Sequence, residues 1–491
     1  MRDTFPDKPI FTGFNAPRRI EAEVADLEVI GELPPALEGV FYRCGPDPKY
    51  PPKYGDDINL NGDGMVTLFR FHDGHVDFRS RYVRTEKFEL EAAARRALFG
   101  VYRNPYTDDA SVAGKDRTTA NTNIVFHAGR LFALKEDGLP HELDPFTLAT
   151  RGRYDYGGRL RSKTFTAHPK IDPATGEMIA FGYEATGLAS RDMAVQVIDP
   201  AGELVREEFF EAPYCSFQHD FAVTDRHIVF ALMPCTADDD RMRAGGAHWM
   251  FEPDREVAIG VMARDGSPQG IRWFRGEARG IGHFLNAYDD GDKVVVDGFV
   301  SARNQFPFIA NADGAPFDRE QATPRLSRWT FDLASNSDTF EQETLFQDFM
   351  EMPRVDDRFA MRPHRYGFTT LIDPSKPLNV AGTIGLGWNT LARVDLQART
   401  QSRYYVGDHS TAQEPQFIPR SPDAPEADGY LLCVVTRYDG EPRSELIVLD
   451  TARMEDGPVA TVRMPFRLRG AIHGNWVSAE ALASAATTTD N

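Results

Sequence analysis

The chain has 491 residues, a formal net charge of −19 and no low-complexity stretch. A hydrophobic content of 41% with 26% charged residues is typical of a folded globular protein, which excludes a disordered or fibrous chain. The acidic charge and the lack of any Lys/Arg block argue against a nucleic-acid partner.

The N-terminus lacks the apolar core of a signal peptide, and no run of about 18 uncharged apolar residues occurs. We therefore expect a cytoplasmic protein without stable membrane insertion. The four cysteines are scattered and form no CxxC pair, so reduced structural thiols are expected. A homodimer is compatible with the sequence, which does not define an oligomeric state.

Helical periodicity is scarce, and one short helix is predicted over residues 89–98, a run rich in strong helix formers. Almost all of the remaining chain has the pattern of strands and turns. A strand, an Asp in or beside a turn and a second strand recur seven times. In chain order these pairs span residues 66–78, 142–151, 194–205, 259–274, 326–340, 391–404 and 445–462.

The turn aspartates recur at intervals of 55 to 71 residues. One such pair alone cannot bury both faces of its small sheet, whereas a β-propeller packs such sheets around a central axis. We therefore predict an all-β fold, a single seven-bladed β-propeller over residues 1–491. Insertions between blades, including residues 86–125 with the predicted helix, are expected to form a cap of loops and helix.

Four of the twelve histidines lie at the edge of strand-like segments in different blades: His168, His219, His283 and His473. The innermost strands of a propeller run along its axis, so one side chain from each of four blades can point at a common axial position. Neutral imidazole suits iron, zinc or copper, and four imidazoles leave open positions on an octahedral metal. The sequence therefore predicts an axial metal site beneath the cap.

A ligating imidazole usually donates its other N–H to an acceptor, which fixes the direction of the ring. Glu136, Glu351 and Glu414 are the candidate acceptors, because each lies in an apolar or proline-containing context. Most of the 74 acidic residues are expected to be solvated, so the pattern alone is a weak signal for any one glutamate.

Three segments near the N-terminus resemble one known family. Residues 35–48 (Pro-Ala-Leu-Glu-Gly-Val-Phe-Tyr-Arg-Cys-Gly-Pro-Asp-Pro) are similar to the N-terminal signature of the carotenoid cleavage oxygenases. Residues 61–66 (Asn-Gly-Asp-Gly-Met-Val) resemble the DGDGM segment of that family, with Asn61 in place of its first Asp, and residues 81–86 resemble the strand that follows. With the histidine and glutamate contexts, the resemblance covers essentially the whole chain.

This resemblance implies a seven-bladed propeller with iron(II) on the four histidines and O2 as co-substrate. It also implies that Glu136, Glu351 and Glu414 support His219, His283 and His473 in that order, whereas His168 has no glutamate partner.

Lys135 and Tyr102 are similar in sequence to the Lys and Tyr that lignostilbene dioxygenases and related phenylpropene oxygenases place on the 4-hydroxyl group of the substrate. The alternative is a surface lysine and a core tyrosine. A buried ammonium next to a phenol lowers the pKa of the phenol, and the phenolate sends electron density to the para-alkenyl carbons. We therefore expect cleavage of a 4-hydroxystilbene, or a related lignin-derived aryl alkene, to two aromatic aldehydes.

Leu60, Phe306 and Phe308 are the further candidates for the substrate pocket. Leu60 stands where stilbene-cleaving relatives often have an aromatic residue. Both phenylalanines could line an aryl pocket, although phenylalanine is more often a core residue.

Other functions remain open at this point. A phenylpropene cleaver of isoeugenol type and an apocarotenoid cleaver are alternatives within the family. A non-catalytic propeller scaffold and a zinc hydrolase are alternatives outside it, but a scaffold has no use for four imidazoles, and catalytic zinc usually has three protein ligands.

Overall fold

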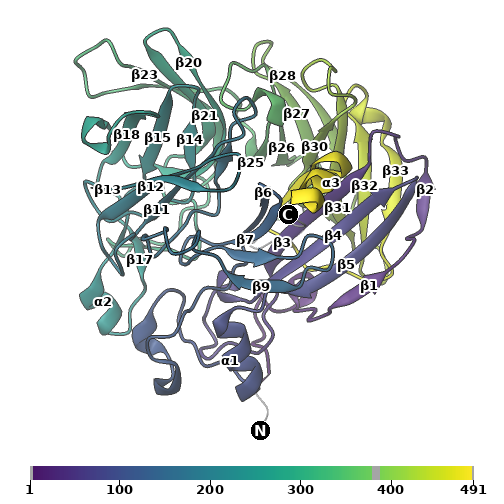
Figure 1. Ribbon diagram of the computed structural model, residues 1–491, viewed down its shortest axis with the longest axis horizontal. Coiled ribbons are helices and arrows are strands. Elements are labelled where there is room, and N and C mark those ends of the chain that lie inside the picture. Colours follow the sequence, from purple (N-terminus) through teal and green to yellow (C-terminus); the bar gives the residue numbers. More distant parts are fainter. Residues whose placement is uncertain (1–3, 379–386, 489–491) are drawn as a thin grey trace. The chain divides into compact units, whose positions relative to one another are not determined.

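The computed structural model describes residues 4–378 and 387–488 (Figure 1). The chain divides into two compact units. The first unit consists of Met1–Asp155, Ile372–Arg393 and Ser402–Asn491. The second unit consists of Tyr156–Leu371 and Val394–Gln401. That the whole chain forms one domain stays a prediction.

Three large sheets belong to the first unit. One has the order β1 (Ala22–Val24), β5 (His75–Tyr82), β4 (Gly64–His72), β3 (Gly39–Pro46) and β34 (His473–Ser478). Another has the order β6 (Asn123–His127), β7 (Arg130–Leu134), β8 (His141–Leu143) and β9 (Thr150–Arg153). The third has the order β2 (Val29–Gly31), β33 (Pro458–Arg463), β32 (Arg443–Asp450), β31 (Gly429–Arg437) and β29 (Ser410–Ala412), with β30 (Gln416–Pro419) also paired to β31.

The second unit contains three four-stranded sheets and a smaller one. The first has the order β10 (Lys170–Ile171), β11 (Met178–Tyr183), β12 (Asp192–Ile198) and β13 (Leu204–Glu211). The next has the order β14 (Phe221–Val223), β15 (His227–Leu232), β18 (Val257–Ala263) and β19 (Arg272–Gly276). The third has the order β20 (Gly280–Asp290), β21 (Lys293–Ser301), β23 (Arg325–Asp332) and β24 (Glu341–Thr344). The small sheet consists of β16 (Cys235–Ala237), β17 (Trp249–Phe251) and β22 (Ala310–Asn311).

A further sheet has the order β25 (Phe349–Arg354), β26 (Tyr366–Ile372), β27 (Thr390–Asp395) and β28 (Thr400–Tyr405). In the part of the chain that the structure describes, seven sheets therefore have four or more strands, which is the predicted number of blades. Six of the seven predicted strand pairs are confirmed as neighbouring strands of one sheet: β4–β5, β8–β9, β12–β13, β18–β19, β27–β28 and β32–β33. In the fifth pair, predicted over residues 326–340, the first strand is β23, but its partner β24 begins only at Glu341.

The recurring aspartate has a local structural cause. The Oδ1 atom of Asp199 accepts hydrogen bonds from the backbone N–H groups of Ala201, at 3.0 Å, and Glu203, at 2.8 Å. A side chain that accepts bonds from the next residues closes the turn in place of a backbone carbonyl. The same arrangement occurs at Asp144, Asp332 and Asp395.

The core of the first unit shows why its strands are apolar on both faces. In β3, Phe41 packs into a cluster with residues of β31, β32 and β33, whereas its neighbours Val40 and Tyr42 pack into a cluster with residues of β6, β7 and β8. Successive side chains of a strand point to opposite faces, so this sheet is covered on both sides. Such packing of neighbouring sheets is how blades bury surface that one blade alone would expose.

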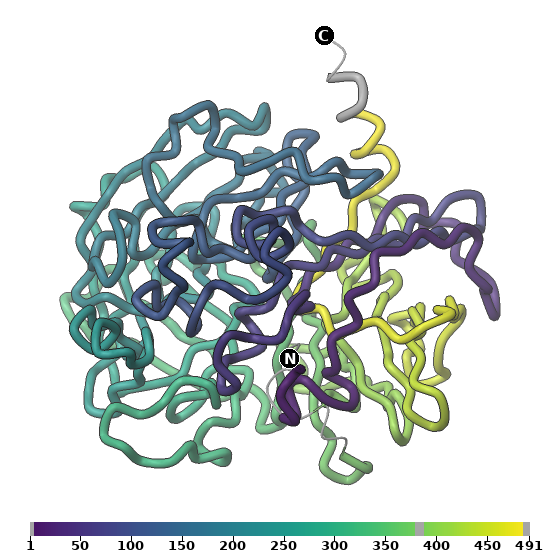
Figure 2. The backbone as a smooth tube through the Cα atoms, turned by 90° about the horizontal axis from the view of Figure 1, so that it is seen from below, coloured from purple at the N-terminus to yellow at the C-terminus, as the bar shows by residue number. Residues whose placement is uncertain are grey.

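The two ends of the chain meet in one sheet. Strand β34 pairs with β3, and Cys44 lies opposite His473. Figure 2 shows the corresponding purple and yellow segments side by side. His473, a predicted metal ligand, is therefore the first residue of β34, and this strand is held by β3, which belongs to the N-terminal signature of residues 35–48.

The predicted helix is confirmed, but its bounds were wrong. Helix α1 spans Glu86–Ala94, because the side chain of Thr85 accepts a bond from the backbone N–H of Phe88 and starts the helix earlier. Arg95 adopts a left-handed conformation with φ of 56°, which ends it. The short helix α2 (Asp239–Arg243) and the C-terminal α3 (Ala479–Thr488) were not predicted.

All four cysteines are free and buried, as expected. Among the described residues, no helix is long and apolar enough to span a membrane.

The turn bonds predict a measurable loss on substitution. Asp199→Ala removes two hydrogen bonds and should lower the free energy of unfolding by about 1 kcal/mol, measured by urea titration. Asp265→Ala is the matched control, because among the described residues Asp265 makes no such turn bond. Equal losses in both variants would contradict this explanation of the repeat.

Candidate metal centre

Three of the predicted ligands lie in the second unit, each at the first strand of its sheet. His168 lies two residues before β10, His219 lies two residues before β14, and His283 lies within β20. One imidazole therefore lies at or near the start of the first strand in each of three sheets.

The three imidazoles converge. The Nε2 atoms of His168 and His219 lie 3.2 Å apart, and those of His219 and His283 lie 2.9 Å apart. Glu351 Oε2 lies 2.7 Å from His283 Nδ1, and Oε1 accepts from the backbone N–H of His283 at 3.2 Å. A carboxylate can only accept, so Nδ1 of His283 carries the proton and its Nε2 presents a lone pair to the other two rings.

This convergence fits a bound cation. Imidazole nitrogens at such short separations repel one another where lone pairs face each other, and a metal ion removes that repulsion by sharing the lone pairs. The donor set is also chemically suited to a first-row transition metal. The residues present therefore fit a metal ion.

His473 and Glu414 form a matching pair in the first unit. His473 Nδ1 lies 2.8 Å from Glu414 Oε1, and Oε2 of the same carboxylate accepts from the backbone N–H of Gly474 at 2.9 Å. The pair repeats the arrangement of His283 and Glu351, in which one carboxylate fixes both a ring and the adjacent backbone. Four histidines form a group that could hold a metal ion: His168, His219, His283 and His473.

The remaining glutamate is buried, with 4% of Glu136 exposed in the first unit. Its predicted support of His219 stays a prediction. On the side of His219, Phe217 stacks on the imidazole with ring centroids 5.8 Å apart, and Phe306 lies 6.5 Å away. Phe308 lies 5.6 Å from Phe306. The sequence analysis missed Phe217, although its place two residues before His219 on an extended segment would have put both side chains on one face.

Lys135 and Tyr102 lie together in the first unit, and both are buried. Lys135 Nζ lies 5.1 Å from the centre of the Tyr102 ring. It donates to the carbonyl oxygen of Leu60 and to Thr119 Oγ1, both at 2.8 Å, and lies 3.4 Å from Asp137. The alternative of a surface lysine is therefore wrong. Leu60 contacts the ammonium through its backbone carbonyl.

Burial sets the protonation of this pair. It lowers the pKa of Lys135, against the opposing effect of Asp137 and Glu136. It raises the pKa of Tyr102 well above its ordinary value, so this phenol stays protonated at neutral pH. The site thus combines a poorly compensated ammonium with a hydrogen-bond donor.

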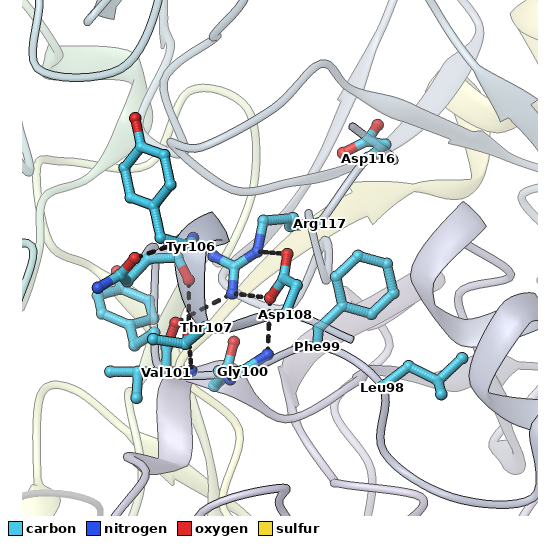
Figure 3. Close-up of polar contacts among 12 residues, drawn as sticks. Leu98, Phe99, Gly100, Val101, Tyr106, Thr107, Asp108, Asp116 and Arg117 are labelled. Atoms are coloured by element: carbon cyan, nitrogen blue, oxygen red, sulfur yellow. Dashed lines mark hydrogen bonds and ion pairs between the residues drawn. The ribbon is translucent and has the colours of Figure 1, made fainter. Parts of the chain in front are cut away.

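The loop that carries Tyr102 is held by a compact polar network (Figure 3). Asp108 pairs with Arg117 at 2.9 Å and accepts from the backbone N–H of Gly100 at 2.7 Å. Arg117 also donates to the carbonyl of Val101, and Thr107 Oγ1 accepts from the backbone N–H of Val101. Residues on both sides of Tyr102 are therefore fixed, which positions its ring on a loop without regular structure.

Comparison with known proteins identifies the family. The family model described as retinal pigment epithelial membrane protein matches residues 15–478. The chain is 48% identical to an isoeugenol monooxygenase of Pseudomonas putida, over 96% of this chain and 98% of that protein. It is 42% identical to a lignostilbene-alpha,beta-dioxygenase isozyme of Sphingomonas paucimobilis, over 98% and 99%.

Among solved structures, a lignostilbene dioxygenase of Pseudomonas brassicacearum has a TM-score of 0.94 at 45% identity, covering 97% of this chain and 100% of that one. The chain therefore belongs to the retinal pigment epithelial membrane protein family, which is the carotenoid cleavage oxygenase family predicted from the sequence. It is an oxygenase with the β-propeller fold of that family.

Gly282 provides a test of the carboxylate–imidazole pair. A Cβ atom at this position would overlap Glu351 Oε1, so Gly282→Ala should displace Glu351 from His283. We expect metal affinity to fall roughly 10–100-fold, as for other losses of a carboxylate that orients a ligand, measured by anaerobic metal titration. Gly270→Ala, where a Cβ meets nothing within 4 Å, should leave the affinity unchanged. Unaltered affinity in a folded Gly282→Ala protein would contradict this role of Glu351.

Proposed function

We propose that the protein is an iron(II)-dependent dioxygenase that cleaves the central double bond of a 4-hydroxystilbene. The alkene takes up one O2, both bonds between the two alkene carbons are broken, and each carbon becomes the aldehyde carbon of one aromatic product. The observation that carries the substrate class is the buried Lys135 beside Tyr102, because an ammonium in that position suits a phenolate.

The number of protein ligands favours iron(II) over zinc, because catalytic zinc usually has three protein ligands and this site offers four histidines. An octahedral site with four protein ligands leaves positions for exogenous ligands, as an oxygenase requires.

We assign His168, His219, His283 and His473 as the iron ligands. Glu351 and Glu414 hold His283 and His473 through Nδ1, so that each presents Nε2. We assign Glu136 to His219 by the family pattern. When bound, iron(II) supplies the chemistry that activates O2.

Lys135 and Tyr102 bind and polarise the substrate. The 4-hydroxyl group is expected to replace Asp137 as the third partner of the ammonium, since that contact is the longest at 3.4 Å. Lys135 then stabilises the phenolate, and Tyr102, which keeps its proton, donates a hydrogen bond to the same oxygen. The charge spreads through the ring to the para-alkenyl carbons and makes the double bond more electron-rich.

Aromatic residues next to the ligands would hold the rings of the substrate. Phe306, with Phe308 beside it, lies close to His219 and provides an apolar face. Leu60 contributes its carbonyl to the position of Lys135, and we assign its side chain to the substrate-binding site.

A 4-hydroxyphenylpropene is the second candidate substrate. The relatives that are 48% identical are named isoeugenol monooxygenases, and such a substrate has the same phenol for Lys135. The two candidates differ in the group on the far side of the double bond, so assays must include both.

The phenolate mechanism predicts discrimination between two matched stilbenes. Iron(II)-loaded protein should cleave 4-hydroxystilbene to aldehydes and leave 4-methoxystilbene uncleaved, followed by chromatography of the products. Lys135→Met should lower kcat/KM for the phenol roughly 100-fold or more, because it removes a charge that acts on the reacting electrons. Tyr102→Phe should lower it less.

Lys49→Met is the control, because Lys49 also lies 5.1 Å from a tyrosine ring, that of Tyr82, but is not buried. It should leave kcat/KM unchanged. If the protein cleaves isoeugenol but neither stilbene, the proposed substrate is a phenylpropene and not a stilbene. Equal turnover of 4-hydroxystilbene and 4-methoxystilbene would contradict the proposed role of Lys135 in stabilising a phenolate.

A further inference from the structure

A cavity in the first unit is surrounded by an unusual number of positive charges. It has a volume of about 30 Å³ and is lined by Arg18, Arg43, Arg467 and Arg469, with Asp47 as its one acidic residue. The net charge of the protein is −19, so this concentration of guanidinium groups does not follow from composition.

The acidic residue does not pair with these guanidinium groups. The two carboxylate oxygens of Asp47 accept from the backbone N–H groups of Arg18, at 3.0 Å, and Arg19, at 2.7 Å. Burial raises the pKa of Asp47, whereas Arg469, Arg467 and these backbone bonds lower it.

The arginines donate to neutral oxygens. Arg43 donates to the Gln413 side chain, Arg467 to the carbonyls of Phe14 and Ala16, and Arg469 to several carbonyls including that of Ile10. Neutral acceptors satisfy hydrogen bonds but carry no charge. Asp47 favours the charged forms of Arg467 and Arg469, and Glu414 that of Arg43, but the cost of burying these charges is larger. Consistently, burial lowers the pKa of Arg43, Arg467 and Arg469 to about 10.

Two donors that line the cavity have no partner. Arg18 Nε and Thr67 Oγ1 are both buried and lack a hydrogen-bond partner within the described residues. Unsatisfied buried polar groups are rare in folded proteins, and each usually marks a missing water or ion. Both groups can donate a hydrogen bond to an anion.

We propose that this cavity binds a small monatomic anion of the halide class, with chloride as its ordinary occupant. A cavity of about 30 Å³ has room for little more than one or two water molecules. A halide fits that space, accepts hydrogen bonds from several directions and compensates the guanidinium charge.

The site is connected to the segment that carries His473. Gln413 Oε1 accepts from Arg43 and also from the backbone N–H of Ala471, at 2.9 Å. Ala471 and Gly470 line the cavity, two and three residues before His473. The anion would therefore stabilise the chain at the start of β34, although the inference does not depend on the proposed reaction.

Bromide provides the direct test, because it replaces chloride and can be located by anomalous diffraction. Crystals of the full chain soaked in sodium bromide should show an anomalous peak inside the cavity. In solution, replacing sodium gluconate by bromide at constant ionic strength should raise Tm, in a saturable manner, by roughly 1–2 °C.

Thr67→Val and Arg18→Gln should abolish the bromide-dependent rise in Tm, and Arg19→Gln, next to the cavity but not lining it, should retain it. If a variant does not fold, the anomalous diffraction peak in the unaltered protein still tests whether the cavity binds bromide. A cavity with no anomalous peak and no specific Tm shift would overturn the proposal in favour of water. A shift with phosphate but not with bromide would overturn the assignment to a halide.

Discussion

The carboxylate–imidazole hydrogen bond is the interaction on which the metal centre depends. In both observed pairs, one carboxylate contacts the ring Nδ1 and a backbone N–H group of the same short segment. The direction of each ring is therefore tied to the backbone of its strand and not only to side-chain packing. A ligand held in this way keeps its Nε2 in place without a metal, which reduces the entropy lost when the metal binds.

The backbone around these pairs is adapted to the same requirement. Gly282 leaves room for Glu351 beside His283, and Gly474 follows His473 where strand β34 passes close to β3. At both positions a side chain would collide with a neighbouring group, so the absence of a Cβ atom is part of the metal centre. Glycine is required at these positions because neighbouring atoms approach closely, and not for its backbone conformation, since neither residue has a positive φ.

The repeat was predictable because its signal is local. Four of the turn aspartates, Asp144, Asp199, Asp332 and Asp395, close their own turns through neighbouring backbone N–H groups, a pattern that can be recognised without knowledge of the fold. The histidines and glutamates were predicted from their residue types and their neighbours in the sequence. Their assignment to pairs came from the family resemblance. The helix bounds depended on the Thr85 cap and the left-handed Arg95, which propensity alone does not reveal. The arginine cavity could not be predicted, because it joins residues near positions 18, 43 and 467, which are far apart in the sequence and meet only in the folded chain.

Two buried lysines of the first unit show how compensation determines what a buried charge can bind. Burial disfavours the ammonium of Lys87, but Asp63, at 3.2 Å, and Glu91, at 2.9 Å, raise its pKa above the ordinary value. Lys135 is equally buried, yet its carboxylate contact is longer and its pKa is lowered. The charge of Lys87 is thus compensated by two carboxylates, and this lysine has a structural role. The carboxylates near Lys135 do not outweigh the effect of burial on its ammonium. An anionic ligand such as a phenolate gains most from a cation of the second kind, because it supplies the compensation that the protein leaves out.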